Sequence, residues 1–230
     1  MKRFWTTVAV DADGVVTLDG RPVRTPGRVP LSLPTPALTA GVVAEWQAVG
    51  DTIDPRLMPL TGLSNAAIDW IAPDPATFAA GLAQYGESDL LCYRAELPEP
   101  LVARQAAAWD PVIAWAQGRY DIAIAVTAGI IHVPQPPATI ARLGEAIAAQ
   151  PAFALAGLST IVTLTGSLLL ALALAEGAID ADTAWAAAHV DEDWQAEMWG
   201  VDDLAAQTLA LKRRDYDGAI AFLAAIGIPA

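Results

Sequence analysis

The sequence predicts an α+β protein, with a small sheet-containing N-terminal domain followed by a helical domain. Residues 4–33 hold short alternating apolar runs separated by turn dipeptides, which is typical of a β-meander. At Thr35 the apolar spacing changes to that of a helix, and from residue 100 onward the helical spacing continues almost to the end. The Pro-Glu-Pro stretch at 98–100 indicates a boundary. We therefore divide the chain into residues 1–95 and 96–230.

The first strands are predicted from alternation and turn chemistry. FWTTVAV (4–10) alternates, DADG (11–14) is a turn, and VVTL (15–18) is a second strand. Asp19-Gly20 is a strong hairpin signal, because both residues tolerate the positive φ that a tight turn requires. Pro22 lacks an amide proton, so the next strand is expected at an edge of the sheet.

The first helix is predicted to begin after Thr35 and to end at Gly50. Thr35 can cap the helix with its hydroxyl, and Pro36 fits the first helical position. Residues of one apolar face follow at helical spacing, namely Leu38, Val42, Trp46 and Val49.

Further helices are predicted over 60–71 and 75–85, the latter capped by Asp74. The apolar run DLLCYRA (89–95) is bounded by a loop and predicts a short strand. Cys92 lies in this run and is expected to be a packed, unreactive thiol.

The second domain is predicted to be helical, with one short extended segment at 128–135. Asp110-Pro111 lies inside the first of its helices, so we expect a kink or a restart there. The predicted helices cover 101–117, 137–149, 159–175, 180–199 and 201–225.

Composition excludes some classes of function. The net charge is −13, and such a surface repels phosphate backbones, so nucleic-acid binding is not expected. A single cysteine cannot form an internal disulfide, which fits a reducing compartment. The first ten residues, MKRFWTTVAV, lack the apolar core of a signal peptide. We expect a soluble, cytoplasmic, monomeric protein.

One uncharged stretch, residues 152–175, is long enough to span a bilayer. Its middle is polar, acids follow it, and no lysine, arginine or aromatic belt flanks it. The Thr165–Ser167 break also divides it. We therefore expect 159–175 to form a helix in the core of the second domain. A membrane-associated protein anchored by 158–175 is the alternative.

The sequence gives only weak support to a metal site or a catalytic site. His189 stands three and four residues before Glu192 and Asp193, a spacing that suits ligands on a helix. No second histidine or cysteine lies nearby, whereas zinc sites usually need more such ligands. His132 lies in an apolar, proline-flanked segment and is expected to be packed or bridged to solvent, and the Thr-Gly-Ser of 165–167 lacks the lysine of a phosphate loop. We predict no cofactor. A metal-dependent or hydrolytic enzyme that uses His189 and its neighbouring acids remains the alternative function.

Residues 184–205 form the best candidate site. On a helix of about 100° per residue, Glu192 falls in the middle of an apolar stripe, whereas Asp191, Asp193 and Trp194 point elsewhere. An acid on an apolar face needs an internal partner or a solvent-filled groove, so Glu192 either pairs inside the protein or contacts another protein. Trp194, if exposed, would also suit an interface. The stripe consists of Trp185, Ala188, His189, Glu192, Ala196 and Trp199.

Short motifs in a fixed order resemble one known family, the assembly chaperones that bind the alpha subunit of the F-type ATP synthase (the ATP12 family). No motif is diagnostic alone, but together they cover nearly the whole chain. They are RFW (3–5), LDGRPVRTP (18–26), LPT (33–35), EW (45–46), IDPRLMPLT (53–61), AID (67–69), DLLCYRA (89–95), LVARQAAAWDP (101–111), GIIHVPQ (129–135), TGSLLLALA (165–173), AW (184–185) and DEDWQAEMWG (191–200).

The resemblance implies a chaperone without enzymatic activity or cofactor. Such a chaperone binds the nucleotide-binding domain of the unassembled alpha subunit. The beta subunit later displaces the chaperone. The implied fold is a small α+β domain followed by an orthogonal helical bundle. Because the sequence starts almost at the RFW motif, we expect a bacterial, cytoplasmic form. The candidate partner-binding residues are Glu192, Trp194, Asp191, Asp193 and His189.

Overall fold

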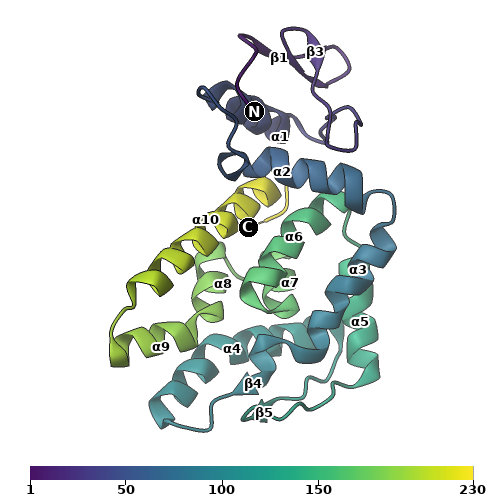
Figure 1. Ribbon diagram of the computed structural model, residues 1–230. Helices are drawn as coiled ribbons and strands as arrows, with labels where there is room; N and C mark the ends of the chain where they lie inside the picture. Colours follow the sequence, from purple (N-terminus) through teal and green to yellow (C-terminus); the bar gives the residue numbers. More distant parts are fainter. Residues whose placement is uncertain (230) are drawn as a thin grey trace.

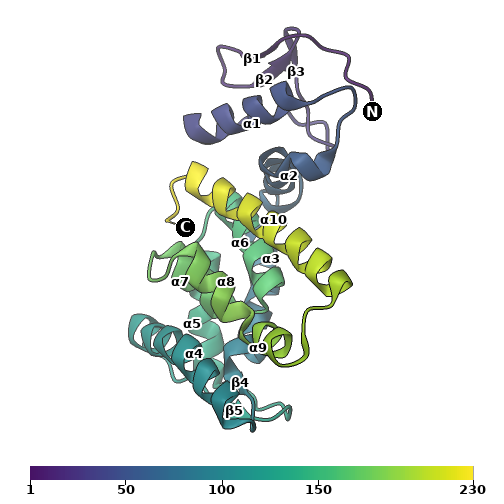
Figure 2. The ribbon, with the colours of Figure 1, turned by 90° about the vertical axis from the view of Figure 1, so that its left-hand side faces the viewer.

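The computed structural model describes residues 1–229 and confirms the α+β class. Figures 1 and 2 show a three-stranded sheet and helix α1 at one end of the molecule, the helical body in the middle, and the short strands β4 and β5 at the opposite end. The C-terminus returns to the middle of the molecule, beside the helices that follow the sheet.

The N-terminal sheet is an antiparallel meander, as predicted. Strands β1 (Val8–Val10), β2 (Val16–Leu18) and β3 (Arg21–Pro22) pair in the order β1-β2-β3. Asp19 and Gly20 both have positive φ, 48° and 76°, as a tight hairpin turn requires. The side chain of Asp19 also accepts hydrogen bonds from the amides of Thr6 and Thr7, which ties the turn to the preceding segment.

Helix α1 (Pro36–Ala48) begins as predicted and ends slightly before Gly50. The Thr35 hydroxyl accepts a hydrogen bond from the Leu38 amide at 3.2 Å and caps the helix. The same hydroxyl donates to the Ala225 carbonyl at 2.6 Å. A residue at the start of α1 is thus bonded directly to the end of the last helix of the chain.

The next helices also match the prediction closely. After the 3-10 turn η1 (Pro55–Leu57) come α2 (Pro59–Ala66) and a π-helical turn, η2 (Ala67–Ile71). Helix α3 (Pro75–Ala83) is capped by Asp74, whose side chain accepts from the Thr77 amide.

The start of α2 has no cap from its own segment, and Glu45 of α1 supplies one. The Glu45 carboxylate accepts hydrogen bonds from the amides of Leu60 and Thr61, at 2.7 and 2.8 Å, and from the Thr61 hydroxyl at 2.7 Å. Burial raises the pKa of Glu45, although these hydrogen bonds oppose the shift. Glu45 therefore fixes the packing of α1 against α2.

We expect Glu45→Ala to lower the free energy of unfolding by about 1–3 kcal/mol, because it leaves two helix N-terminal amides without acceptors. Denaturant unfolding of both proteins measures the change. Glu45→Gln keeps one carbonyl acceptor and should lose less. If Glu45→Ala is as stable as the wild type, the cap is not energetically important.

The predicted strand at 89–95 is mostly wrong. After the 3-10 turn η3 (Gln84–Ser88), residues Leu90–Cys92 form a second such turn, η4, and only Tyr93–Arg94 form a strand, β4. Strand β4 pairs in parallel with β5 (Thr127–Ala128), which overlaps the predicted extended segment, 128–135, only at Ala128. Cys92 is buried, so the prediction of a packed thiol is confirmed, and burial raises its pKa to about 12, which disfavours the reactive thiolate.

The cause of the turn is Asp89, which is buried and makes contacts far along the chain. Its carboxylate accepts from the Leu91 amide at 3.1 Å, from the Ser167 hydroxyl at 2.7 Å, and from the Leu169 amide at 3.0 Å. Desolvation raises the pKa of Asp89 to about 6, against the effect of these hydrogen bonds. A local run that looks like a strand is therefore folded into a turn by tertiary contacts.

The remainder of the chain is helical apart from β5. Helix α4 continues through Pro111 without interruption, where we expected a kink or a restart. The single helix predicted over 159–175 is wrong, because Gly166 ends α6 with a φ of 65° and Ser167 caps α7. The helices are α4 (Glu99–Tyr120), α5 (Pro137–Ala148), α6 (Ala152–Thr165), α7 (Leu168–Ala175), α8 (Ala181–Ala188), α9 (Val190–Trp199) and α10 (Asp203–Ala225).

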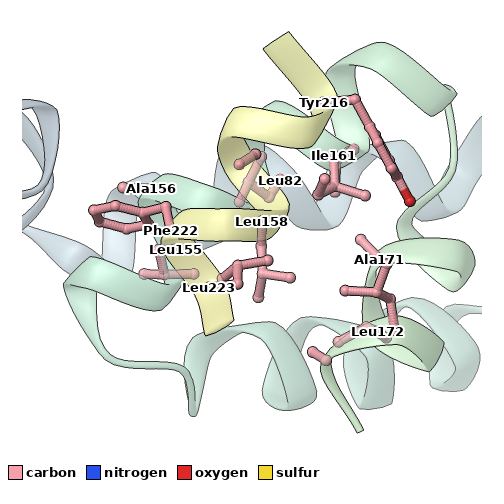
Figure 3. Close-up of a cluster of buried hydrophobic side chains, with 14 of the residues drawn as sticks. Leu82, Leu155, Ala156, Leu158, Ile161, Ala171, Leu172, Tyr216, Phe222 and Leu223 are labelled. Atoms are coloured by element: carbon pink, nitrogen blue, oxygen red, sulfur yellow. The ribbon is translucent and has the colours of Figure 1, made fainter. Parts of the chain in front are cut away.

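The core of the helical body lies where α10 crosses α6 and α7 lies beneath them. Figure 3 shows Leu158, Phe222 and Leu223 among the buried side chains at this crossing. A Cβ atom on Gly157 would stand 2.7 Å from the Leu223 side chain, so the close approach of the two helices requires glycine there. Every residue of α7 is buried. The prediction that 159–175 lies in the core is therefore confirmed.

Within residues 1–229, none of the helices combines the length and the hydrophobicity that crossing a bilayer would require. The uncharged stretch at 152–175 instead forms α6 and α7, which are both largely buried in the protein.

Helices of the predicted first domain also pack on helices of the second. Helix α2 contacts α6 and α10, and α3 contacts α5 and α6. The division of the chain near residue 95 stays a prediction.

Candidate functional site

The predicted helix over 180–199 is interrupted at His189, which ends α8 and begins α9. The His189 side chain is buried, its Nδ1 atom is hydrogen-bonded to the Trp185 carbonyl at 2.8 Å, and its ring stacks on Trp185 with centroids 3.9 Å apart. Over residues 1–229, no group of three or more histidine, cysteine or acidic side chains is arranged to hold a metal ion. His189 thus packs at the joint between two helices.

One face of α9 is fixed to α4. The Gln105 side chain donates to Asp191 at 2.7 Å and accepts from the Ala95 amide at 2.8 Å. Because Gln105 is buried, Asp191 is held in place by a structural contact. Asp191 therefore positions α9 and points away from the apolar stripe, as the helical projection predicted.

Trp194 lies on this same face and is half-buried, whereas we considered it as an exposed residue. The Arg104 guanidinium lies 5.0 Å from the centroid of the Trp194 ring. Arg104 also donates two hydrogen bonds to the Glu197 carboxylate, at 2.7 and 2.6 Å, and this contact lowers the pKa of Glu197. Trp194 thus serves to join α9 to α4.

The opposite face of α9 lines a groove with a volume of 1040 Å³, which we call the α9–α10 groove. Its other wall is the first half of α10, and the Gly200–Asp202 turn closes one end. Of the predicted stripe, Trp185, His189, Glu192, Ala196 and Trp199 line the groove. The helical projection is therefore confirmed for this face. Asp193 also lines the groove, so its predicted orientation is wrong.

The groove has exposed apolar walls. Trp199 of α9 is 78% exposed and Leu204 of α10 is 71% exposed, with Val201 exposed between them. Residues 203–208, the first turns of α10, are all exposed, whereas its later residues Phe222 and Leu223 are buried in the core. A patch of exposed large apolar side chains rimmed by polar groups is typical of an interaction site.

Some charged side chains in the groove form ion pairs and others do not. Arg213 is held by Asp182 at 2.7 Å and by Asp217 at 2.8 Å, and it lies over the Trp185 ring. In the described part of the chain, the side chains of Glu192 and Asp193 form no hydrogen bond or ion pair, although both are exposed in the groove. Within residues 1–229, the groove thus offers unpaired carboxylates, together with the unpaired ammonium group of Lys212, beside apolar surface.

Sequence reasoning missed the wall formed by α10. The stripe on α9 could be found from its spacing, but Leu204, Lys212 and Arg213 line the groove only because α10 folds back across the Gly200 turn. The sequence VDDLAAQTLALKRR contains apolar residues at helical spacing, and this signal indicates a helix without showing which face is left uncovered.

Comparison with known proteins decides the family. The family model described as ATP12 chaperone protein matches residues 2–117, which is half of the chain. This chain belongs to the ATP12 chaperone family. Its membership confirms the resemblance found in the short motifs and supports a chaperone role.

Similarity to solved structures covers nearly the whole chain, including the residues that line the α9–α10 groove. Atp12 from Paracoccus denitrificans is 44% identical over 98% of both chains, with a TM-score of 0.89. A mutant of the same Paracoccus denitrificans protein matches at 43% identity over 97% of both chains, with a TM-score of 0.88. A protein of Agrobacterium tumefaciens, to which a chaperone role is attributed, is 41% identical over 98% of this chain and 86% of its own, with a TM-score of 0.91.

Proposed function

We propose that this ATP12-family chaperone binds the unassembled alpha subunit of the F-type ATP synthase and keeps it from aggregating until the beta subunit displaces it. The α9–α10 groove is the observation that carries the proposal, because it joins exposed apolar walls to unpaired acids. We further propose that the protein acts as a monomer in the bacterial cytoplasm.

The apolar walls account for protection against aggregation. A subunit made for a larger assembly exposes apolar surface before its neighbour arrives, and such surface aggregates. Trp199 and Leu204 stand on facing walls of the groove and can cover part of that surface. A single groove of this kind covers a modest area, which suits a contact that must later be released.

The carboxylates account for orientation. With a net charge of −13, the chain attracts a basic surface over a distance of about a Debye length. Glu192 stands inside the groove without an internal partner, so a basic group of the alpha subunit can pair with it without breaking an existing contact. Acidic groups placed in this way raise association rates and exclude acidic partners.

The groove provides the test. Glu192→Gln keeps the shape of the side chain and removes its charge. We expect an unchanged melting temperature and weaker protection of the alpha subunit in an aggregation assay, because a charged contact inside an interface is worth roughly 2–5 kcal/mol. Binding of the purified alpha subunit measures the same loss directly.

Glu145→Gln is the matched control, since Glu145 is exposed on α5, away from the groove, and undergoes the same chemical change. It should protect as well as the wild type. If Glu192→Gln also protects fully, or if it instead lowers the melting temperature, the functional role of Glu192 is wrong.

A further inference from the structure

A second apolar surface lies at the far end of the molecule, on the loop of residues 126–134. Ile130 is 99% exposed and Ile131 is 78% exposed, and Leu97, on the neighbouring segment, is 79% exposed. Figures 1 and 2 place the strands β4 and β5, from which these segments leave, at the end opposite the N-terminal sheet. None of these three side chains lines the α9–α10 groove.

The loop is held in place at both of its ends. The buried Gln135 side chain accepts from the Ala125 amide at 2.9 Å and donates to the Ala125 carbonyl at 2.8 Å. Within the loop, the Tyr93 hydroxyl is hydrogen-bonded to Nδ1 of His132 at 2.8 Å. The anchored loop thus presents both isoleucines to solvent.

The backbone at the tip of the loop also lacks hydrogen-bond partners within the described chain. Strand β5 pairs with β4, and the Gly129 amide donates to the Arg94 carbonyl at 2.9 Å. Beyond that point, the described chain provides no backbone hydrogen bond to residues 130–133. Pro134 favours an extended conformation in the residue before it. Gly129 and Ile130 form a bend, and the free backbone groups that follow it can pair with a strand from another chain.

The charges around the tip restrict the kind of partner. Glu96 packs against Gly129, and both Glu96 and Glu99 are exposed beside Leu97. An acidic rim disfavours an anionic membrane surface and disfavours pairing with the same rim of a second copy. It suits a protein segment that has basic residues next to apolar ones.

We propose that Ile130, Ile131 and Leu97 form a second client-binding surface that takes an extended apolar segment flanked by basic residues. This inference rests on the proposed function, because the client is the same unassembled alpha subunit. The two surfaces would hold one client at separate points, so that release from one of them does not free it.

The double variant Ile130→Ser, Ile131→Ser tests the proposal through its affinity for purified alpha subunit. Each serine removes the gain from burying an isoleucine side chain in the complex, so we expect the affinity to fall roughly tenfold or more. The melting temperature should stay unchanged, since both side chains are exposed in the free protein. Hydrogen exchange should show that the amides of 130–133 become protected in the complex.

The matched control is Leu57→Ser with Val10→Ser, two exposed apolar residues that lie on η1 and β1, outside the loop. It should bind as the wild type does. When the tip variant is combined with Glu192→Gln, the two fold-losses in affinity should multiply, because separate sites act independently.

The outcomes separate the two proposals. If the wild type does not bind alpha subunit, both are wrong. If the wild type binds and Glu192→Gln weakens binding while the tip variant binds normally, only the tip surface is wrong. Co-sedimentation with vesicles of phosphatidylcholine and phosphatidylglycerol, or self-association in sedimentation velocity, would also overturn it if the tip variant abolished either.

Discussion

Replacing Leu170 with aspartate is expected to prevent the chain from folding into soluble protein. Leu170 is fully buried in α7, all of whose residues are buried. The substitution removes an apolar side chain and places an unpaired charge in the core, and each change costs several kcal/mol. Together they approach the whole free energy of folding of a typical domain, about 5–15 kcal/mol.

The soluble fraction after expression and the thermal transition by circular dichroism measure this effect. Leu170→Met keeps the volume and should cost less than about 1.5 kcal/mol. Leu211→Asp makes the same chemical change at an exposed position of α10 and should remain folded. A cooperative transition at the wild-type temperature in Leu170→Asp would show that α7 is not part of the core.

Asp89→Asn is expected to change how stability depends on pH. The folded state raises the pKa of Asp89 from 3.8 to about 6, so it binds this proton more tightly than the unfolded chain does. The stabilisation from protonation is complete below pH 3.8 and is lost as the pH rises through 6. Between pH 7 and pH 4, the wild type should therefore gain roughly 2 kcal/mol over Asp89→Asn, which has no such proton to bind.

Urea unfolding at both pH values measures the difference between the two proteins and cancels the titration of the other acids. Asp180→Asn is the control, and its stability difference from the wild type should change with pH in the opposite direction. The Asp180 carboxylate caps α8, and its hydrogen bonds with Thr183 lower its pKa. The advantage of the wild type over Asp180→Asn should thus shrink as the pH falls. A difference between wild type and Asp89→Asn that does not change with pH would refute the effect of Asp89.

The elements predicted best from the sequence are those whose ends are encoded locally. Thr35 and Asp74 each cap a helix with their own side chain, and Asp19-Gly20 makes its own turn. Such signals need no distant residue, so the sequence alone can show them. The 89–95 prediction failed for the opposite reason, since Asp89 folds this segment through Ser167 and Leu169.

Only the α9 side of the candidate site could be predicted from the sequence. The spacing of Glu192, Ala196 and Trp199 places them on one face of α9, and the structure confirms that face as a wall of the groove. The roles of Asp191 and Trp194 depend on Gln105 and Arg104 of α4, which no local pattern connects to α9. The tip of the 126–134 loop was visible only as an extended segment, because exposure is a property of the folded chain.

The hydrogen bond from Thr35 to Ala225 has a consequence for synthesis of the protein. It joins residues 190 positions apart, and α10 also packs on α1, α2 and α6. While the ribosome is still making α10, the apolar surfaces of α1, α2 and α6 that it packs on are exposed to solvent. Contacts between residues so far apart in the sequence also form slowly. A nascent chain of this chaperone must itself pass through a stage in which its apolar surfaces wait for their partner.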